Sequence, residues 1–287
     1  MDYAKQYQEY LARANQALEK ACETFLPEES EVCRAARYSL LGGGKRIRAV
    51  LVLAVCDMLN GSAEAAEQFA AAVEMLHCYS LIHDDLPCMD NDDLRRGKPT
   101  NHRVYGEATA VLAGDALLTA AFGELASAKL PSERIERAVR TLALCAGELG
   151  MVGGQVLDML AEERKCTEQD VYAIESRKTG ALISAACQLG VIAAGGDCLP
   201  AAVAYAQSLG LAFQIQDDVL DSVGDAKKLG KAVGMDEHKN TFVRLYGVEQ
   251  CRRMVRSETE RAVAALQAMP NAEFLTGLAN SLVDRES

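Results

Sequence analysis

The sequence has no tryptophan, only 5% aromatic residues and no long apolar run. Its longest apolar run, residues 49–56, is too short to span a membrane, because a spanning helix needs about 20 apolar residues. The first residues do not combine a basic start with an apolar stretch, so they lack the pattern of a signal peptide. We therefore expect a soluble, cytoplasmic protein without a membrane span.

Basic residues are also scarce, since 30 Lys and Arg stand against 41 Asp and Glu and the formal net charge is −11. This balance argues against a general nucleic-acid or anionic-membrane binder, which needs a net basic face. The ten cysteines include no Cys-x-x-Cys pair, which argues against a zinc site of that kind and a disulfide framework. We expect reduced cysteines that pack as small apolar residues.

Apolar residues make up 49% of the chain and recur mainly at spacings of three and four, the period of amphipathic helices. No segment alternates as strands do, and no linker divides the chain. The sequence predicts an all-α protein, one domain over residues 1–287 with about ten helices. The expected helices cover residues 3–26, 30–41, 46–59, 62–86, 107–130, 132–150, 155–163, 167–194, 200–223 and 248–269, with a short tail helix and loops at 87–106 and 224–240.

Two clusters of aspartates lie at the C-terminal ends of expected helices. They consist of Asp84, Asp85 and Asp90, and of Asp217, Asp218 and Asp221. The helix dipole disfavours a carboxylate there by about 0.3–1 kcal/mol. Pro87 breaks the first helix and lets Asp90 turn back toward Asp84, while Asp217 and Asp221 share one helix face. Crowded carboxylates repel unless a cation intervenes, and oxygen ligands suit Mg²⁺. Two solvated helix ends are the alternative interpretation.

Basic residues are organised around these clusters. Residues 42–48 form a glycine turn entering a helix, where free N–H groups, Lys45 and Arg48 favour an anion. A capping turn with solvated basic side chains is the alternative. His77 lies two helical turns before Asp84, where a buried histidine with satisfied hydrogen bonds is the plainer interpretation. Further candidates for anion contacts are Arg95, Arg96, Lys178, Lys231 and Lys239.

At these residues the chain resembles the trans-polyprenyl diphosphate synthases, specifically the short-chain bacterial and plant group. Residues 84–90 resemble the family's first aspartate-rich motif, Asp-Asp-x4-Asp, and residues 213–221 resemble the second. Segments 43–48, 95–100, 153–155 and 178–180 match further family motifs in the same order. The resemblance implies an isoprenoid synthase fold, in which helices surround a central cavity. It also implies Mg²⁺-dependent condensation of isopentenyl diphosphate with dimethylallyl or geranyl diphosphate, commonly by a homodimer.

The resemblance assigns a role to each matching residue. Asp84, Asp90 and Asp217 resemble ligands of about three Mg²⁺ ions, with Asp85, Asp218 and Asp221 as direct or water-mediated support. Contacts to the allylic diphosphate are implied for Arg95, Lys178, Lys231 and Lys239, and contacts to isopentenyl diphosphate for Lys45, Arg48, His77 and Arg96. Thr179 and Gln214 resemble polar groups beside the developing cation, so we expect Lys178, Thr179 and Gln214 to be catalytic.

Product length depends on packing beside the first motif. Tyr79 and Ser80 lie five and four residues before Asp84, where the growing tail is expected to run. A ring at Tyr79 blocks growth sterically and resembles bacterial farnesyl synthases, although an ordinary core aromatic is the plainer interpretation. Residues 84–102 also resemble plant geranylgeranyl synthases, so that product is the alternative.

Three other functions fit less well. A terpene cyclase typically carries a different second metal motif, and a silent partner subunit is expected to lose aspartates, whereas all six are present. A helical scaffold would bind neither Mg²⁺ nor diphosphates. The chain departs from the family pattern at two places. His238 stands in the loop that contains Lys239, and the C-terminal tail is less basic.

Overall fold

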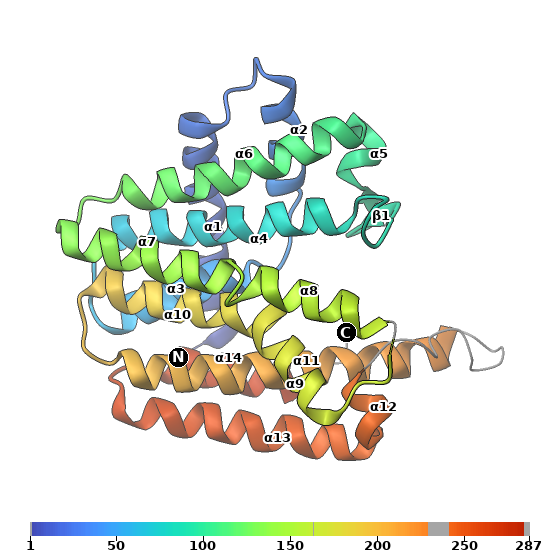
Figure 1. Cartoon of the computed structure of the whole chain (residues 1–287). Coiled ribbons are helices and arrows are strands. Elements are labelled where there is room, and N and C mark those ends of the chain that lie inside the picture. Colours follow the sequence, from blue (N-terminus) through green and yellow to red (C-terminus); the bar gives the residue numbers. More distant parts are fainter. Residues whose placement is uncertain (1, 163, 229–240, 284–287) are drawn as a thin grey trace. The chain divides into compact units, whose positions relative to one another are not determined.

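The computed structural model describes residues 2–162, 164–228 and 241–283. These residues are almost entirely helical (Figure 1), so the expected all-α class is confirmed. The described strands are β1 (Leu94–Arg95) and β2 (Lys98–Pro99), a short antiparallel hairpin inside the expected loop 87–106. Internal contacts group the described residues into two compact units, residues 2–142 with 189–196, and residues 143–188 with the described residues after 196. The single-domain interpretation stays a prediction.

The first unit is built around two buried helices, α3 and α4. Its helices are α1 (Tyr3–Phe25), α2 (Glu31–Leu40), α3 (Ile47–Met58), α4 (Ala63–Asp84), α5 (Asn101–Tyr105), α6 (Glu107–Ala126) and most of α7 (Ser132–Ala146). The side chains of Asp2, Ser30 and Ser62 accept hydrogen bonds from the first turns of α1, α2 and α4, as capping residues do. Nearly every side chain of α3 is buried, because this helix is apolar on all sides.

The second unit contains the remaining helices. They are α8 (Met151–Glu162), α9 (Glu168–Glu175), the π-helical turn η1 (Ser176–Gly180), the larger part of α10 (Ala181–Ala194), α11 (Leu199–Lys228), α12 (Phe242–Tyr246), α13 (Val248–Ala265), the 3₁₀ turn η2 (Leu266–Ala268) and α14 (Glu273–Val283). Ile215, Val219 and Phe242 are fully or almost fully buried together, so α11, α12 and α13 share one core. The capping box of Thr167 and Asp170 opens α9.

Several predicted boundaries were wrong. The loop expected at 87–106 contains α5, and the loop expected at 224–240 is helical to Lys228. The helix expected over 167–194 is divided by the wider turn η1. Helix α8 begins at Met151 instead of residue 155, and α12 was not predicted. Short helices such as α5 and α12 contain too few residues to show a periodic pattern, which explains why they were missed.

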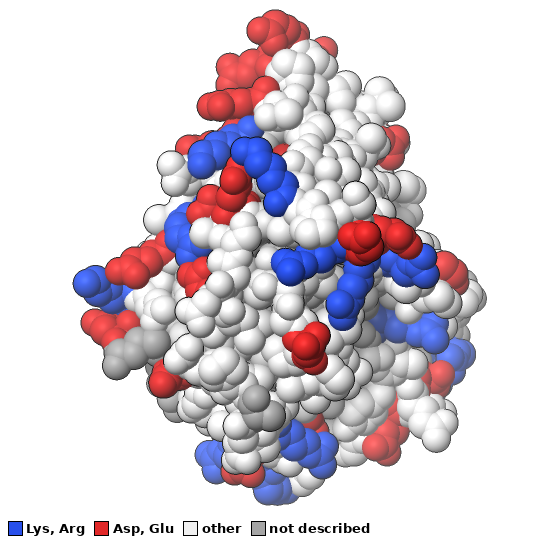
Figure 2. All heavy atoms as spheres, turned by 90° about the vertical axis from the view of Figure 1, so that its left-hand side faces the viewer, with Lys and Arg blue, Asp and Glu red and all other residues white. Residues whose placement is uncertain are grey.

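Within the described chain, α6 is the helix long and apolar enough, by length and composition, to cross a membrane. Inside the structure, 44% of its most apolar stretch is buried, and a single helix of this kind is weak evidence for a membrane span. On the face shown in Figure 2, acidic and basic side chains are interspersed among uncharged surface. The charge pattern of this face therefore agrees with the composition, which disfavours a general binder of nucleic acid.

Candidate functional site

The first aspartate cluster lies where α4 ends. Asp84 is the last residue of the helix and Asp85 is its C-cap. Beyond Pro87 the chain turns, and the backbone N–H of Asp90 donates to the backbone oxygen of Asp84 across 2.8 Å. The predicted return of Asp90 to Asp84 is therefore observed. The return places an exposed carboxylate next to a half-buried one at the end of the helix.

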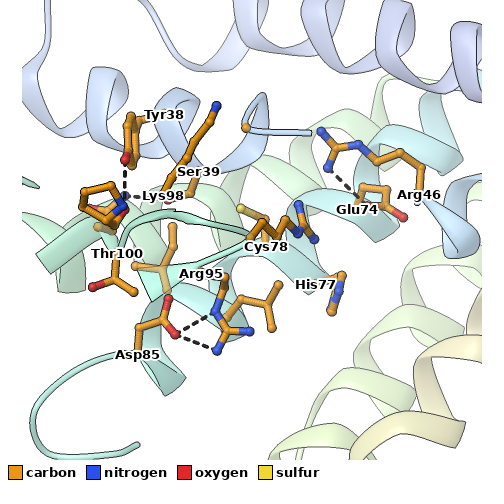
Figure 3. Close-up of a pocket in the computed structure, with 16 residues that line it drawn as sticks. Tyr38, Ser39, Arg46, Glu74, His77, Cys78, Asp85, Arg95, Lys98 and Thr100 are labelled. Carbon is orange, nitrogen blue, oxygen red and sulfur yellow. Dashed lines mark hydrogen bonds and ion pairs between the residues drawn. The ribbon is translucent and has the colours of Figure 1, made fainter. Parts of the chain in front are cut away.

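Asp85 is buried and paired with Arg95 (Figure 3). Oδ1 of Asp85 accepts a hydrogen bond from Nε of Arg95 at 2.7 Å, and Nη2 of the same guanidinium lies 2.6 Å from that oxygen. Burial raises the pKa of Asp85, and the hydrogen bond from Arg95 opposes this change. The β1–β2 hairpin delivers Arg95 to this position, so it brings a cation back to the end of α4.

A cluster of positive charge surrounds His77 on α4. Burial and then four arginines hold the pKa of His77 well below its usual 6.5. These arginines are Arg48, Arg96, Arg95 and Arg46. Burial also lowers the pKa of Arg48, and its Nε is buried without a hydrogen-bond partner among the described residues. A neutral imidazole beside concentrated arginines and an unsatisfied buried N–H group form a strong site for an anion.

The glycine turn is shaped by Arg96. Nη1 of Arg96 donates to the backbone oxygen of Gly43. A Cβ atom at Gly44 would lie 2.7 Å from the guanidinium carbon of Arg96, and Gly44 also has a φ of +129°. Glycine is therefore favoured at position 44 by the backbone conformation, whereas a Cβ atom would only have to displace the flexible end of the Arg96 side chain. Lys45 is exposed beside this turn, and the Tyr7 hydroxyl donates to its backbone oxygen at 2.5 Å.

Arg46 and Glu74 form a buried pair next to the same turn. The sequence analysis did not select either residue as a candidate. Both side chains are buried, with Nη1 of Arg46 3.6 Å from Oε2 of Glu74. Nη2 of Arg46 donates to the Leu40 oxygen at 2.5 Å, and Glu74 Oε1 accepts from the backbone N–H of Ala49 at 3.2 Å. Figure 3 shows that they line one pocket together with His77, Asp85 and Arg95. Arg46 caps α3 within the matched segment 43–48, but its partner Glu74 lies on α4, so nothing local in the sequence indicated the pair.

Tyr79 and Ser80 lie one turn before the aspartates. Tyr79 is buried, and its ring meets the His83 ring edge-on with the centroids 5.7 Å apart. The Nε2 atom of His83 lies 3.0 Å from the backbone oxygen of Val111, which ties this part of α4 to α6. The Ser80 hydroxyl donates back to the His77 oxygen at 2.9 Å. Tyr79 is thus a buried ring, packed against His83, at the position expected to limit the product.

The second group of candidates lies in the second unit, around η1. Nζ of Lys178 lies 2.5 Å from Oδ2 of Asp158 on α8. Thr179 follows within the same turn. A Cβ at Gly154 would collide with the backbone nitrogen of Lys178, so glycine lets α8 and η1 touch. This contact explains why glycine stands in the 153–155 motif. Asp158 was missed by the sequence analysis, although it lies on the helix of that motif.

Gln214 on α11 is bound to Glu175, the last residue of α9. Its Nε2 donates to Oε2 of Glu175 across 2.6 Å. Burial raises the pKa of Glu175 to about 7, and the hydrogen bond from Gln214 opposes the shift. The sequence analysis did not select Glu175 as a candidate residue. The one feature that could have indicated it was its position three residues before Lys178. The structure thereby joins two of the expected catalytic segments through a residue that no motif indicated.

The second aspartate cluster lies on α11. Oδ2 of Asp218 accepts the backbone N–H of Phe242 at 2.8 Å, while burial raises the pKa of Asp218 to about 6. Asp217 is partly buried and Asp221 is exposed. Lys231, Lys239 and His238 lie outside the described residues. The Asp218 contact connects this cluster to α12.

The carboxylates fit a metal that takes only part of its ligands from the protein. Across the described residues, no three His, Cys, Asp or Glu side chains gather closely enough to hold an ion alone. Mg²⁺ usually keeps several waters and binds through one or two carboxylates together with substrate phosphates. Asp90 is exposed and Asp84 and Asp217 are partly exposed, so each can share an ion with water or a substrate phosphate, whereas Asp85 is buried against Arg95.

Known proteins match nearly the whole chain. The family model described as polyprenyl synthetase matches residues 29–272. The chain is 43% identical to farnesyl diphosphate synthase of Escherichia coli (strain K12), with 99% of this chain and 98% of the relative aligned. It is 41% identical to heterodimeric geranylgeranyl pyrophosphate synthase large subunit 1 of Arabidopsis thaliana, over 98% of this chain and 80% of that protein.

A solved structure gives the same answer for the fold. The crystal structure of an FPP/GFPP synthase from Zymomonas mobilis superimposes with a TM-score of 0.87 at 36% identity, over 97% of this chain and 99% of that one. The resemblance seen in the motifs and the expected isoprenoid synthase fold are both confirmed. The chain belongs to the polyprenyl synthetase family.

Proposed function

We propose that this trans-prenyltransferase condenses isopentenyl diphosphate with dimethylallyl and then geranyl diphosphate to give (2E,6E)-farnesyl diphosphate. The observation that carries the proposal is the pocket that His77, Arg95 and Arg96 line together, beside the carboxylates that end α4. This arrangement offers donors for phosphate oxygens and ligands for divalent cations within one unit. It is difficult to explain as a purely structural feature, because like charges in close proximity destabilise an unliganded fold.

The residues divide the work of binding and ionisation. Lys45, Arg48, His77 and Arg96 bind isopentenyl diphosphate, and Arg95, Lys178, Lys231 and Lys239 bind the allylic diphosphate. Thr179 and Gln214 direct polar groups at the developing allylic cation. The isopentenyl double bond attacks this cation, and the departing diphosphate takes the proton that is then lost. Apolar walls exclude water, which would otherwise trap the cation.

About three Mg²⁺ ions complete the site. Asp84, Asp90 and Asp217 would hold them, with Asp85, Asp218 and Asp221 in support. When bound, Mg²⁺ masks the negative charge of the diphosphate and so makes it a better leaving group. Arg95, which Asp85 orients, and Lys178 add fixed positive charge for the same leaving group.

The farnesyl product is proposed because the buried Tyr79 ring limits the space for a longer tail. Geranylgeranyl diphosphate is the second candidate, supported by the 41% identity to the Arabidopsis thaliana geranylgeranyl pyrophosphate synthase subunit.

We also propose a cytoplasmic homodimer. Val111 and Leu112 on α6 are 40% and 52% exposed, and a second copy of the chain would cover them. Light scattering tests the dimer, since a monomeric mass would contradict it.

One incubation tests the proposed reaction. Isopentenyl diphosphate, dimethylallyl diphosphate and Mg²⁺ are incubated with the chain, and the extracted products are separated by length. We expect a fifteen-carbon product that is lost on adding a chelator and in Asp84→Ala. The exposed Asp197→Ala serves as the matched control and should keep full activity.

Each unfavourable outcome contradicts a different part of the proposal. Turnover retained in Asp84→Ala would reject the metal assignment, and a twenty-carbon product would reject the farnesyl assignment. Failure of the wild-type chain to join the two substrates would reject prenyl coupling altogether. A cyclic hydrocarbon product would indicate a terpene cyclase instead.

A further inference from the structure

The contact between Gln214 and Glu175 joins two segments with proposed catalytic roles. Gln214 lies on α11, one turn before Asp217 and Asp218. Glu175 ends α9 and immediately precedes η1, which carries Lys178 and Thr179. Both side chains are partly buried within the second unit, so the 2.6 Å hydrogen bond is shielded from water. A shielded hydrogen bond to an ionised group is among the stronger polar contacts in proteins.

The chemistry of Glu175 decides which end of the Gln214 amide points toward it. The NH₂ and oxygen ends of a glutamine side chain have nearly the same shape, and only their hydrogen-bond partners distinguish them. An ionised carboxylate accepts hydrogen bonds and donates none. Above pH 7, where Glu175 with its raised pKa of about 7 is ionised, the NH₂ group of Gln214 therefore faces Glu175. Its carbonyl oxygen, Oε1, faces away, and the structure gives this oxygen no hydrogen-bond partner among the described residues.

This orientation matters because the two ends of an amide interact oppositely with a cation. The carbonyl oxygen carries partial negative charge and attracts a developing carbocation, whereas the NH₂ group would repel it. Donation from Nε2 to an anionic carboxylate also polarises the amide and increases the negative charge on Oε1. The carboxylate thus both selects the favourable end of the amide and strengthens it.

We propose that Glu175 is a positioning residue that fixes the Gln214 amide with its carbonyl oxygen toward the allylic cation. The inference rests on the function proposed above, in which Gln214 stabilises that cation. Glu175 touches no substrate and acts through Gln214. The π-helical turn after Glu175 is consistent with this role, since such wide turns occur frequently at functional sites.

A double-mutant cycle in the full chain separates this role from a structural one. Wild type, Glu175→Ala, Gln214→Leu and the double variant are assayed with geranyl and isopentenyl diphosphate at pH 8, where Glu175, with a pKa of about 7, is ionised. With Gln214 present, Glu175→Ala should lower kcat by about 10- to 100-fold and change KM for the allylic substrate by less than about threefold. In the Gln214→Leu background the same change should lower kcat by less than about twofold.

Two further variants control the experiment. Glu175→Gln keeps the shape and should lose less activity than Glu175→Ala, because its own amide still accepts from Gln214 in one orientation. If Glu175→Ala fails to fold, Glu175→Gln takes its place in the double-mutant cycle. The exposed Glu260→Gln is the matched control for loss of a carboxylate and should leave kcat unchanged.

The result that would overturn the inference is clear. Equal losses of kcat from Glu175→Ala in both backgrounds, or no loss when Gln214 is intact, would show that Glu175 does not act through Gln214. Failure of the wild-type chain to couple the substrates is a different observation, because it rejects the proposed function itself. The two failures are therefore distinguishable.

Discussion

Lys178 and Asp158 form a close ion pair, with Nζ 2.5 Å from Oδ2, between the π-helical turn η1 and α8. The cation proposed to bind the allylic diphosphate therefore has an internal carboxylate partner before any substrate arrives. Both side chains are partly exposed, so the pair contributes little to stability and exchanges readily. In the proposed complex, Asp158 and the diphosphate would compete for the same ammonium group.

This competition leads to a binding prediction. Asp158→Asn should tighten binding of inorganic diphosphate by about 1.4- to fivefold, since a partly exposed ion pair is worth roughly 0.2–1 kcal/mol. Lys178→Met should weaken it by about tenfold or more, because hydrogen bonds to charged groups are worth roughly 1.5–3 kcal/mol. Isothermal titration calorimetry without added metal measures both. Glu249→Gln, which breaks the exposed pair with Arg252, is the control, and weaker binding by Asp158→Asn would contradict the competition.

A second prediction concerns the length of the product. Tyr79→Ala should shift the main product from fifteen to twenty carbons, because it removes a buried ring from the proposed path of the tail. Tyr79→Phe keeps the ring and its edge contact with His83, and should leave the product unchanged. Chain-length analysis of the extracted products checks both variants. An unchanged product in Tyr79→Ala would mean that the ring only packs the core.

The buried pair of Arg46 and Glu74 should contribute strongly to the stability of the first unit. Arg46→Met leaves the Glu74 carboxylate buried without its cation, which costs about 3–5 kcal/mol in the free energy of unfolding. Adding Glu74→Gln should recover part of this loss, because the uncompensated charge is gone. Arg140→Met breaks an exposed pair with Glu136 and should cost less than about 0.5 kcal/mol. Urea unfolding measures all of these, and a similar cost for Arg46→Met and Arg140→Met would contradict the prediction.

Glu124 on α6 should make stability depend on pH. It is 8% exposed, and burial raises its pKa from 4.5 to about 6. The folded state therefore holds the proton more tightly than the unfolded state, so this contribution to stability is present below pH 4.5 and is lost as the pH rises through 6. Glu124→Gln should be more stable than wild type by up to about 2 kcal/mol at pH 8.

The same comparison at lower pH provides the control for Glu124. Near pH 4.5 the difference between Glu124→Gln and wild type should fall below about 0.5 kcal/mol, because the carboxyl is then almost fully protonated in the folded state and half protonated in the unfolded state. Other carboxylates titrate in both proteins and cancel in the comparison. Urea unfolding at the two pH values measures the difference. A gain of equal size at both would show that protonation of Glu124 is not its cause.

Local chemistry explains what the sequence predicted well. Helical periodicity, the capping box of Thr167 and Asp170, and the break at Pro87 all act within a few residues, so they can be read along the chain. The return of Asp90 to Asp84 was predicted from Pro87 for this reason. The short helix α5 and the extension of α11 to Lys228 were missed because local signals there were weak.

The sequence by itself determined the helical class, the family and the candidate residues, because motif spacing and periodicity are properties of neighbouring positions. Only the tertiary structure decided the partners of those residues. Arg96 meets Gly43 across 53 positions, Glu175 meets Gln214 across 39, and Asp158 meets Lys178 across 20. Contacts of this kind depend on how whole helices pack against one another. They determine which carboxylates are engaged, which cations are paired and which way an amide faces.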